Sequence, residues 1–247
     1  MAVNVGSVAG KVRALIFDTG GTVFDWHSGV TEAFSRIGAE FGIDTDWPAL
    51  TKEWRRTSTD MVKEGLPTDG GRASIDMDGV LRMTLDKMLE ERGIEGFSPE
   101  ARARLVHAWH DLDAWSDVVE ALPRLRRKFI VSPFTILNTR LVIDASRRAG
   151  LSWDCVISCE MIGIYKTLPG SYETAARWLG HPHDEILLVT THNNDLQAAH
   201  ENGFPTAFVY RPDEWGDIPS LDPEPDPRAD LICQDFNDLA AQLGCER

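Results

Sequence analysis

The chain has 247 residues, of which 43% are hydrophobic and 26% are charged; this is typical of a globular protein long enough for one large domain, or for one domain with a smaller insert. The formal net charge of −14 argues against nucleic acid or an anionic membrane as a partner, because phosphates would be repelled and no basic block compensates. No apolar run approaches membrane-spanning length, and the segment MAVNVGSVAG lacks the charged start and apolar core of a signal peptide, so we expect a cytoplasmic protein.

The first predicted strand is the apolar run VRALIF, residues 12–17, which ends at Asp18. Its length and its content of Val, Ile, Leu and Phe are typical of a buried strand. Gly20 and Gly21 follow, and they predict a turn. Because open α/β sheets bind ligands at the carboxyl ends of their strands, Asp18 is placed to face a small molecule. A turn-capping role for Asp18 is the alternative that this stretch alone leaves open.

Four helices are predicted next, because apolar residues recur at three- and four-residue spacing over residues 30–43, 47–65, 77–94 and 98–112. Ser98 followed by Pro99 has the pattern of a helix N-cap with proline in the first turn. These helices interrupt an alternation of strands and helices that continues further along the chain. We therefore predict that residues 26–115 form an inserted, all-helical cap domain.

Strands and helices alternate in the second half of the chain. The predicted strands cover residues 129–134, 154–160, 185–190, 206–210 and 229–233, and the predicted helices cover 118–128, 141–151, 172–180, 195–203 and 235–244. The proline-rich residues 211–228 are expected to form a loop. Such alternation predicts a parallel sheet with right-handed crossovers. The predicted fold class is therefore α/β, with a doubly wound, Rossmann-like core of residues 11–25 and 116–247 that carries the cap.

The chain contains four cysteines, which are Cys155, Cys159, Cys233 and Cys245. Cys155 and Cys159 are not accompanied by a second pair or by histidines at zinc spacing, so the cysteines do not predict a metal site. We expect all four to be buried, unreactive thiols in a reducing compartment.

Polar side chains follow several of the predicted strands. Asp18, Thr135, Lys166 and Asp195 each stand after one of them. Because the carboxyl ends of parallel strands meet at one edge of a sheet, a carboxylate, a hydroxyl, an ammonium group and a second carboxylate would converge on one pocket. The ordinary alternatives are an exposed lysine for Lys166 and a helix N-cap for Asp195.

The order and setting of these residues resemble the haloacid dehalogenase superfamily of hydrolases, and within it the 2-haloacid dehalogenase (type II) branch. The resemblance extends from about Val12 to Leu243 and includes the segments YKTLPGSY, HNNDLQAAHENGFPTAFV and EWRR. For catalysis it implies the nucleophile Asp18 together with Lys166 and Asp195. For substrate binding we predict Arg55 from the cap, Thr22, Thr135, Tyr172, Thr190, His192 and Asn193.

Gly20 separates two kinds of chemistry within this superfamily. In the phosphatases, the second residue after the nucleophile is an aspartate that acts as a general acid and helps to place magnesium. Gly20 stands at that position and has no proton for a departing alcohol, whereas a halide leaves without one. The segment DTGGT therefore favours substitution at a carbon–halogen bond.

The chain also departs from the dehalogenases at several positions. They usually have an aromatic residue at the Gly20 position, and they often have Ser-Asn where this chain has Thr135-Ile136. In the last motif, Thr190 and His192 stand where a serine and an asparagine are typical.

The resemblance implies a two-step covalent displacement. Asp18 attacks the carbon that bears the halogen, and water then hydrolyses the resulting ester with help from Asp195 and Lys166. Arg55 receives the halide or the substrate carboxylate. The expected substrate is a small anion, a short 2-haloalkanoic acid, and the products are halide and a 2-hydroxy acid.

This scheme requires no cofactor and no metal. If Asp18 and Asp195 held magnesium instead, the protein would be a magnesium-dependent phosphatase acting on a small metabolite. A relative that has lost catalysis and only binds a ligand is a third alternative, and the joint presence of Asp18, Lys166 and Asp195 argues against it. A homodimer is compatible with such a fold.

Overall fold

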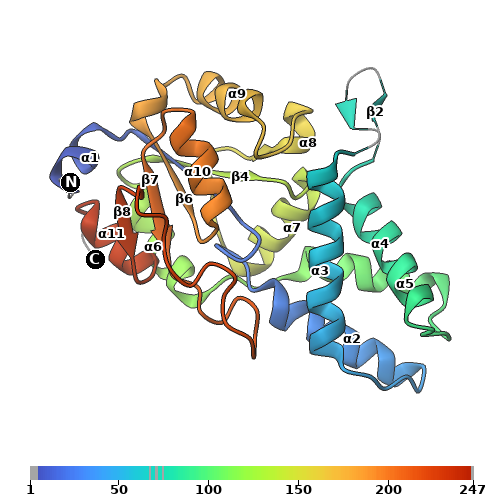
Figure 1. Cartoon of the computed structure of the whole chain (residues 1–247). Coiled ribbons are helices and arrows are strands. Elements are labelled where there is room, and N and C mark those ends of the chain that lie inside the picture. Colours follow the sequence, from blue (N-terminus) through green and yellow to red (C-terminus); the bar gives the residue numbers. More distant parts are fainter. Residues whose placement is uncertain (1–4, 67, 70–71, 74, 246–247) are drawn as a thin grey trace.

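A computed structural model describes residues 5–66, 68–69, 72–73 and 75–245 of the chain. Its centre is a six-stranded sheet in the order β5-β4-β1-β6-β7-β8, in which every neighbouring pair is parallel (Figure 1). The strands are β1 (Ala14–Phe17), β4 (Ile130–Thr135), β5 (Ile157–Ser158), β6 (Ile186–Thr190), β7 (Thr206–Val209) and β8 (Leu231–Cys233). The predicted α/β fold class is confirmed.

The strand order creates a crevice beside β1. From β1 the chain continues through β4 and β5 on one side of the sheet and then crosses to β6, β7 and β8 on the other. The direction of strand addition therefore changes between β1 and β6, and in such sheets this point is where ligands bind. Residues 14–17 are fully buried in the sheet interior, which fixes the strand that leads to Asp18.

Helices cover both faces of the sheet, as the alternating pattern predicts. They are α1 (Val5–Lys11), α6 (Ser116–Arg126), α7 (Thr139–Ala149), α8 (Cys159–Ile162), α9 (Pro169–Leu179), the 3-10 helix η2 (His183–Glu185), α10 (Asn193–Glu201) and α11 (Phe236–Gln242). Helix α6 packs against α11, while α10 packs against β6 and β7. The first turn of α10 thereby lies at the carboxyl end of β6, next to the crevice.

The predicted cap helices form a second group, to the right in Figure 1. They are α2 (Trp26–Glu40), α3 (Trp47–Glu64), α4 (Met77–Glu91), α5 (Pro99–His107) and the 3-10 helix η1 (Ala108–Asp111). The side chains of Asp25, Asp46, Asp76 and Ser98 each accept a hydrogen bond from a backbone N–H in the first turn and so cap α2 to α5. Trp54 and Trp109 are fully buried among these helices.

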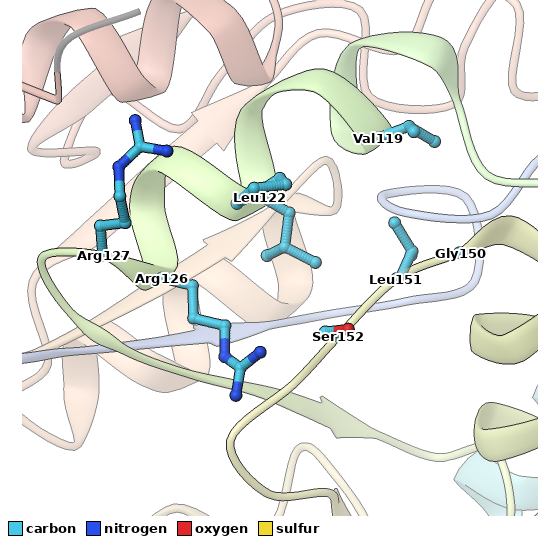
Figure 2. A pocket seen from close by; sticks show the side chains of 8 residues that line it. Val119, Leu122, Arg126, Arg127, Gly150, Leu151 and Ser152 are labelled. Carbon is cyan, nitrogen blue, oxygen red and sulfur yellow. The ribbon is translucent and has the colours of Figure 1, made fainter.

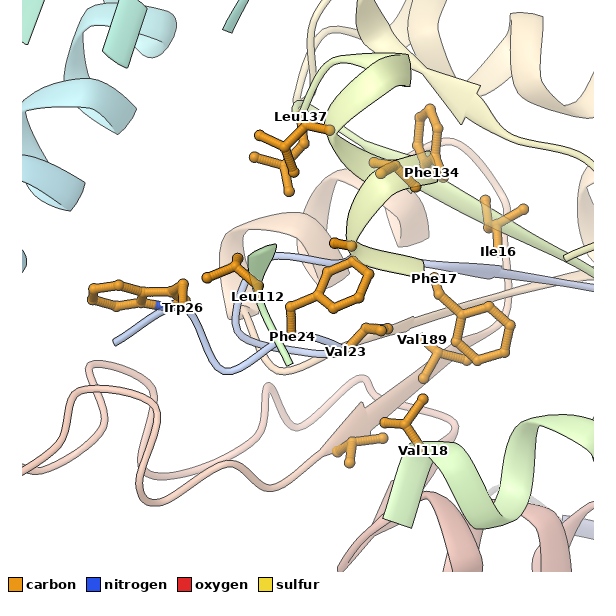
Figure 3. Packing of buried hydrophobic residues seen from close by; sticks show 14 of the residues in the cluster. Ile16, Phe17, Val23, Phe24, Trp26, Leu112, Val118, Phe134, Leu137 and Val189 are labelled. Carbon is orange, nitrogen blue, oxygen red and sulfur yellow. The ribbon is translucent and has the colours of Figure 1, made fainter. Parts of the chain in front are cut away.

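The two connections between the sheet and the cap helices run side by side. Asp25 N donates to Asp113 O, and Trp115 N donates to Val23 O, both at 3.0 Å. Figure 3 shows the apolar side chains packed around this junction, among them Phe17, Phe24, Trp26, Leu112 and Val118. The loop that follows Asp18 is therefore held between the sheet and the first cap helix.

Three local expectations are wrong, and one short helix was not predicted. The strand predicted over residues 154–160 is reduced to β5, which pairs only with the last two residues of β4, and Ser158 Oγ then caps α8 by accepting from Glu160 N. Helix α1 was not predicted. A short antiparallel hairpin of β2 (Thr68–Asp69) and β3 (Arg72–Ala73) interrupts the cap, which is therefore not all-helical. Cys155 is exposed, whereas Cys159, Cys233 and Cys245 are buried as expected.

The boundaries 11–25, 26–115 and 116–247 stay predictions, and residues 246–247 lie outside the described part. Among the helices that the structure describes, none combines the length and the apolar character that crossing a bilayer requires.

Candidate active site

A cavity of about 580 Å³ lies where β1 and β6 end and α3 faces the sheet. The charged groups that line its inner part come from five segments: Asp18 after β1, Arg55 on α3, Lys166 between α8 and α9, His192 and Asp195 at the start of α10, and Glu214 in the loop after β7. The sheet order thus brings Asp18, Lys166 and Asp195 together, as their positions after strands predict.

Asp18 is 8% exposed and is surrounded by donors. Its Oδ1 lies 3.4 Å from Lys166 Nζ, and its Oδ2 accepts from Thr22 Oγ1 at 2.9 Å and lies 3.2 Å from His192 Nδ1. Burial alone would raise the pKa of Asp18, but Lys166, His192 and Thr22 together outweigh burial and hold it well below its usual range. Asp18 is therefore an ionised carboxylate that faces the cavity.

Lys166 joins the two carboxylates of the site. Its Nζ donates to Asp195 Oδ2 at 2.7 Å, and Tyr172 Oη donates to Asp195 Oδ1 at 2.6 Å. Burial would lower the pKa of Lys166, but the charges of Asp195 and Asp18 raise it overall. Burial and the neighbouring Asp195 raise the pKa of Tyr172, so it stays a neutral donor. Asp195 is thus oriented by a cation and a phenol, not used as a helix cap.

His192 lies between two carboxylates. Its Nδ1 is 3.2 Å from Asp18 Oδ2, and its Nε2 is 3.0 Å from Glu214 Oε1. Burial lowers the pKa of His192, but the charges of Glu214 and Asp18 outweigh it and raise the pKa to about 10. The imidazole is therefore an imidazolium at neutral pH, and an acid does stand beside Asp18 even though Gly20 supplies none.

Arg55 reaches the same cavity from α3. Its guanidinium lies over the rings of Trp26 and Trp109, at 5.6 and 5.9 Å from the ring centroids, and its Nη2 is 3.4 Å from Gly20 O. Burial lowers the pKa of Arg55, partly offset by Glu214 and Asp18, and a guanidinium stays charged all the same. Its Nη1 is buried and has no hydrogen-bond partner within the described residues, so it is free to bind an anion.

Two glycines allow the side chains of Arg55 and Glu214 to approach the backbone after Asp18. A Cβ on Gly21, which has φ +99°, would stand 2.1 Å from Glu214 Oε1, so only glycine fits there. A Cβ on Gly20 would stand 3.0 Å from Arg55 Nη2. The space that an aromatic residue would take at position 20 is thus occupied by the Arg55 guanidinium.

The hydroxyls of three predicted substrate-binding residues, Thr22, Thr135 and Thr190, face the protein instead of the cavity. Thr22 Oγ1 holds Asp18 and accepts from Thr191 N. Thr135 Oγ1 is bonded to Thr19 Oγ1 at 2.6 Å, and Thr190 Oγ1 accepts from His192 N at 3.1 Å. These three hydroxyls fix the loops that carry Asp18 and His192, and their contact with a substrate stays a prediction.

Asn193 is tied to the loop after β7. Its Nδ2 donates to Glu224 O and its Oδ1 accepts from Asp226 N, so the structure gives it no contact with the cavity. The next residue, Asn194, lines the cavity instead. The register of α10 thus turns the Asn193 carboxamide toward the loop, and substrate contact by Asn193 stays a prediction.

The loop of residues 211–228 contributes more to the site than the sequence indicated. Glu214, Trp215, Leu221 and Asp222 all line the cavity. Glu214 also accepts from Trp26 Nε1 at 3.1 Å, which links the loop to the first cap helix. In the sequence, only the length of this loop pointed to a functional role, because long loops without secondary structure in compact domains are often functional.

The residues present do not fit a magnesium ion between Asp18 and Asp195. Each of their four carboxylate oxygens already faces a donor: Lys166 for Asp18 Oδ1 and Asp195 Oδ2, Thr22 and His192 for Asp18 Oδ2, and Tyr172 for Asp195 Oδ1. The ammonium group of Lys166 occupies the space between the two carboxylates, where a divalent cation would be repelled. A search of the described residues finds no cluster of three or more His, Cys, Asp or Glu side chains suited to a metal.

A second hollow of about 410 Å³ lies between α6 and the chain after α7 (Figure 2). Val119, Leu122 and Leu151 form part of its wall, and the charged side chains that line it are Arg126 and Arg127. Among the described residues, no carboxylate and no histidine line this hollow. This hollow therefore lacks the paired acid and base groups of the first cavity.

Known proteins share this sequence and this architecture. A family model described as haloacid dehalogenase-like hydrolase matches residues 12–203. The (S)-2-haloacid dehalogenase 4A of Burkholderia cepacia is 28% identical over 206 residues, which cover 81% of this chain and 84% of that protein. The crystal structure of the defluorinating L-2-haloacid dehalogenase Rha0230 matches with a TM-score of 0.87 and 35% identity, over 94% of this chain and 95% of that one. The L-2-haloacid dehalogenase PA0810 matches with a TM-score of 0.87 and 32% identity, over 95% and 100%. The chain belongs to the haloacid dehalogenase-like hydrolase family.

Proposed function

We propose that the protein is a hydrolytic dehalogenase of short 2-haloalkanoic acids that works through an ester on Asp18. The observation that carries this proposal is the pairing of an ionised carboxylate, Asp18, with the unpartnered Nη1 of Arg55 in one cavity. A carboxylate nucleophile and a separate anion receptor are what substitution of a halide requires. The similar proteins described above are 2-haloacid dehalogenases, which supports the same substrate class.

In the first step, an Asp18 oxygen attacks the carbon that bears the halogen. The electron pair of the carbon–halogen bond leaves with the halide, and no proton is needed. Arg55, held over the two tryptophan rings, receives the halide or the substrate carboxylate. The side chains of Asp18, Lys166 and Arg55 are largely buried, so their charges act more strongly on an anion than they would in water.

In the second step, water adds to the Cγ atom of Asp18 and gives a proton to Asp195. The bond between Cγ and the ester oxygen breaks, and the departing hydroxy acid takes a proton from Lys166. Lys166 recovers a proton from Asp195 Oδ2, 2.7 Å away. The proton left on the new Asp18 carboxyl group passes to solvent, so one turnover releases one halide and one proton.

The magnesium-dependent phosphatase is supported less well. Position 20 has no acid side chain, and Lys166 occupies the space between the two carboxylates that would hold the ion. A protein that only binds a ligand would not need Asp18 ionised next to an oriented Asp195 and a free guanidinium nitrogen.

The test compares two activities of the same preparation. Halide release from (S)-2-chloropropionate is measured in chelator, and phosphate release from an aryl phosphate is measured with magnesium. We expect halide release that chelator does not reduce. In one turnover with excess protein in heavy-oxygen water, the label should appear first in the Asp18 side chain, as read by mass spectrometry of the peptide.

Three results would overturn the proposal. Chelator-sensitive phosphatase activity without halide release would favour the phosphatase. Label that enters the product directly, with Asp18 unlabelled, would exclude the ester. Protein that is inert toward every haloacid and phosphate, yet binds 2-hydroxypropionate, would favour the ligand-binding alternative.

A further inference from the structure

The two oxygens of Asp18 have different surroundings. Oδ2 has two side-chain donors, Thr22 Oγ1 at 2.9 Å and His192 Nδ1 at 3.2 Å. Oδ1 faces Lys166 Nζ at the longer distance of 3.4 Å. A lone pair that is engaged by two donors is a poorer nucleophile than one that is engaged weakly, so the difference distinguishes the two oxygens chemically.

The ring of His192 is also fixed on its other side. Its Nε2 lies 3.0 Å from Glu214 Oε1, and Glu214 is 1% exposed and held in addition by Trp26 Nε1. Two ring nitrogens that each face a carboxylate oxygen both need a hydrogen atom. The geometry therefore holds His192 as an imidazolium.

We propose that Asp18 attacks through Oδ1, that Thr22 and His192 bind Oδ2 as the oxyanion of ester hydrolysis, and that Glu214 is a positioning residue that keeps His192 charged. This assignment rests on the proposed function and deepens it, because it distinguishes the two steps of that reaction. His192 becomes a catalytic residue of the second step.

The charge on Oδ2 changes through the reaction. In the free carboxylate it carries about half of one negative charge, in the ester it is a neutral carbonyl oxygen, and in the tetrahedral intermediate it carries a full charge. A donor at Oδ2 therefore stabilises the intermediate more than it stabilises either the carboxylate or the ester. During attack by Oδ1 the same donor loses strength, so His192 does not assist the first step.

Glu214 explains how His192 remains charged when it is needed. Once the ester forms, Asp18 no longer carries a charge that favours the imidazolium. The remaining charged groups around the pair are Glu214, which contacts the ring, and Arg55 and Lys166, which face the carboxylates. Of these groups only Glu214 is an anion in contact with His192, and it stands in the loop after β7, where the chemistry of Asp18 does not alter it.

The step balances without a further reactant. Water adds to Cγ, its proton goes to Asp195, and the π electron pair of the carbonyl moves onto Oδ2 between Thr22 and His192. The pair then returns to re-form the carbonyl while the bond from Cγ to Oδ1 breaks and Oδ1 leaves with the hydroxy acid. His192 keeps its proton throughout, so it acts by charge and hydrogen bonding alone.

The experiment follows the two steps separately in His192→Asn, His192→Gln and Glu214→Gln with (S)-2-chloropropionate. Rapid quenching measures the halide burst, and intact-protein mass measures the ester adduct. In the His192 variants we expect ester hydrolysis to slow about 100-fold, the loss seen when one oxyanion donor is removed, while the halide burst changes only a few-fold. The adduct should then accumulate to about one per protein molecule. Glu214→Gln should slow the same step by a smaller factor.

His200→Asn is the matched control, since His200 lies exposed at the other end of α10, and it should follow the wild type in both steps. Equal slowing of both steps in the His192 variants would reduce His192 to a packing role and contradict the assignment, as would unchanged ester hydrolysis. Thermal melting of each variant separates these results from loss of folding, and the Asn and Gln variants of His192 must agree. If wild-type protein releases no halide, the proposed function itself fails; if it releases halide and the variants show no adduct, only the assignment of His192 fails.

Discussion

Two histidines of this protein each lie between two carboxylates, and their settings differ. His192 bridges Asp18 and Glu214 in the cavity, whereas His110 on η1 bridges Asp78 on α4 and Asp144 on α7, at 3.1 and 3.0 Å. Burial lowers the pKa of His110, but Asp78 and Asp144 outweigh it and raise the pKa above its ordinary value, as the carboxylates do for His192. The local chemistry is therefore the same in both places.

The two His–carboxylate bridges differ in how exposed they are to solvent and to a substrate. The His192 side chain is 22% exposed and lines the cavity, and one of its carboxylates is the proposed nucleophile. The His110 side chain is 6% exposed, and its carboxylates come from a predicted cap helix and a helix of the sheet domain. The same charged His–carboxylate bridge thus stands at the proposed reaction site in one place, and in the other it joins two helices away from the cavity.

The largest expected effect comes from removing the carboxylate of Asp18. Asp18→Asn should lower turnover of a 2-haloacid by roughly 10³-fold or more, because the covalent step loses its nucleophile. Steady-state halide release measures the loss, and binding of 2-hydroxypropionate by calorimetry checks that the cavity still takes an anion. Retained turnover would mean that the bridge at His192 is as structural as the one at His110.

The second effect concerns the arginines beside the two bridges. Arg140 Nε is paired with Asp144 at 2.7 Å, whereas Arg55 has an unpartnered Nη1. Arg55→Ala should lower kcat/KM about 100-fold, because an anion loses a buried donor. Arg55→Lys should recover only part, since an ammonium group lacks the planar fork of donors. Arg140→Ala should leave kcat/KM within about twofold, and a loss equal to that of Arg55→Ala would remove the distinction.

The third effect concerns stability. His110→Gln should lower the free energy of unfolding by about 1–3 kcal/mol, the range for hydrogen bonds to charged groups, with kcat unchanged. Since the folded pKa of His110 is raised above the unfolded value, its contribution is fully present below the unfolded pKa and is lost as pH rises through the folded pKa.

Denaturant titrations of wild type and His110→Gln at pH 6 and pH 9 check this sign, and the difference between them should be larger at pH 6. His107→Gln is the control, because His107 is exposed and only stacks on His110. A difference that grows toward pH 9 would show that the bridge does not hold a proton.

The smallest expected effect concerns Tyr172, which contacts Asp195 beside the cavity. Tyr172→Phe removes the donor to Asp195 Oδ1 and should slow ester hydrolysis about tenfold, the equivalent of one lost hydrogen bond to a charged group. Tyr165→Phe is the matched control, since Tyr165 Oη is buried with no hydrogen-bond partner among the residues that the structure describes. Equal rates in the two variants would place Tyr172 outside the machinery.

Much of the architecture could be predicted from local pattern. The apolar run before Asp18, the amphipathic spacing of the four cap helices and the alternation after residue 116 correspond to β1, α2–α5 and the remaining strands and helices. The predicted strand over residues 154–160 failed because β5 is an edge strand that pairs only with the last two residues of β4, and pairing length depends on the neighbouring chain. Helix α1 has too short a pattern to separate from a loop.

The candidate site was also predictable only in part. Asp18, Lys166 and Asp195 stand next to strand or helix ends, so their convergence follows from the parallel sheet. Thr135 and Asn193 also stand near such ends, yet their side chains turn to Thr19 and to the backbone near residue 224. Which way a side chain turns depends on loop conformation, which the linear pattern does not contain.

The sequence alone determined the fold class and the order of the elements, because these depend on periodicity and on position along the chain, and its resemblance to a known family pointed to Asp18 as the proposed nucleophile. Only the tertiary structure revealed that Glu214 meets His192, that Gly20 and Gly21 make room for Arg55 and Glu214, and that Lys166 fills the space between the two carboxylates. The physical reason is that charge states follow from distances of a few ångströms between groups far apart in sequence, and only the packed chain sets those distances.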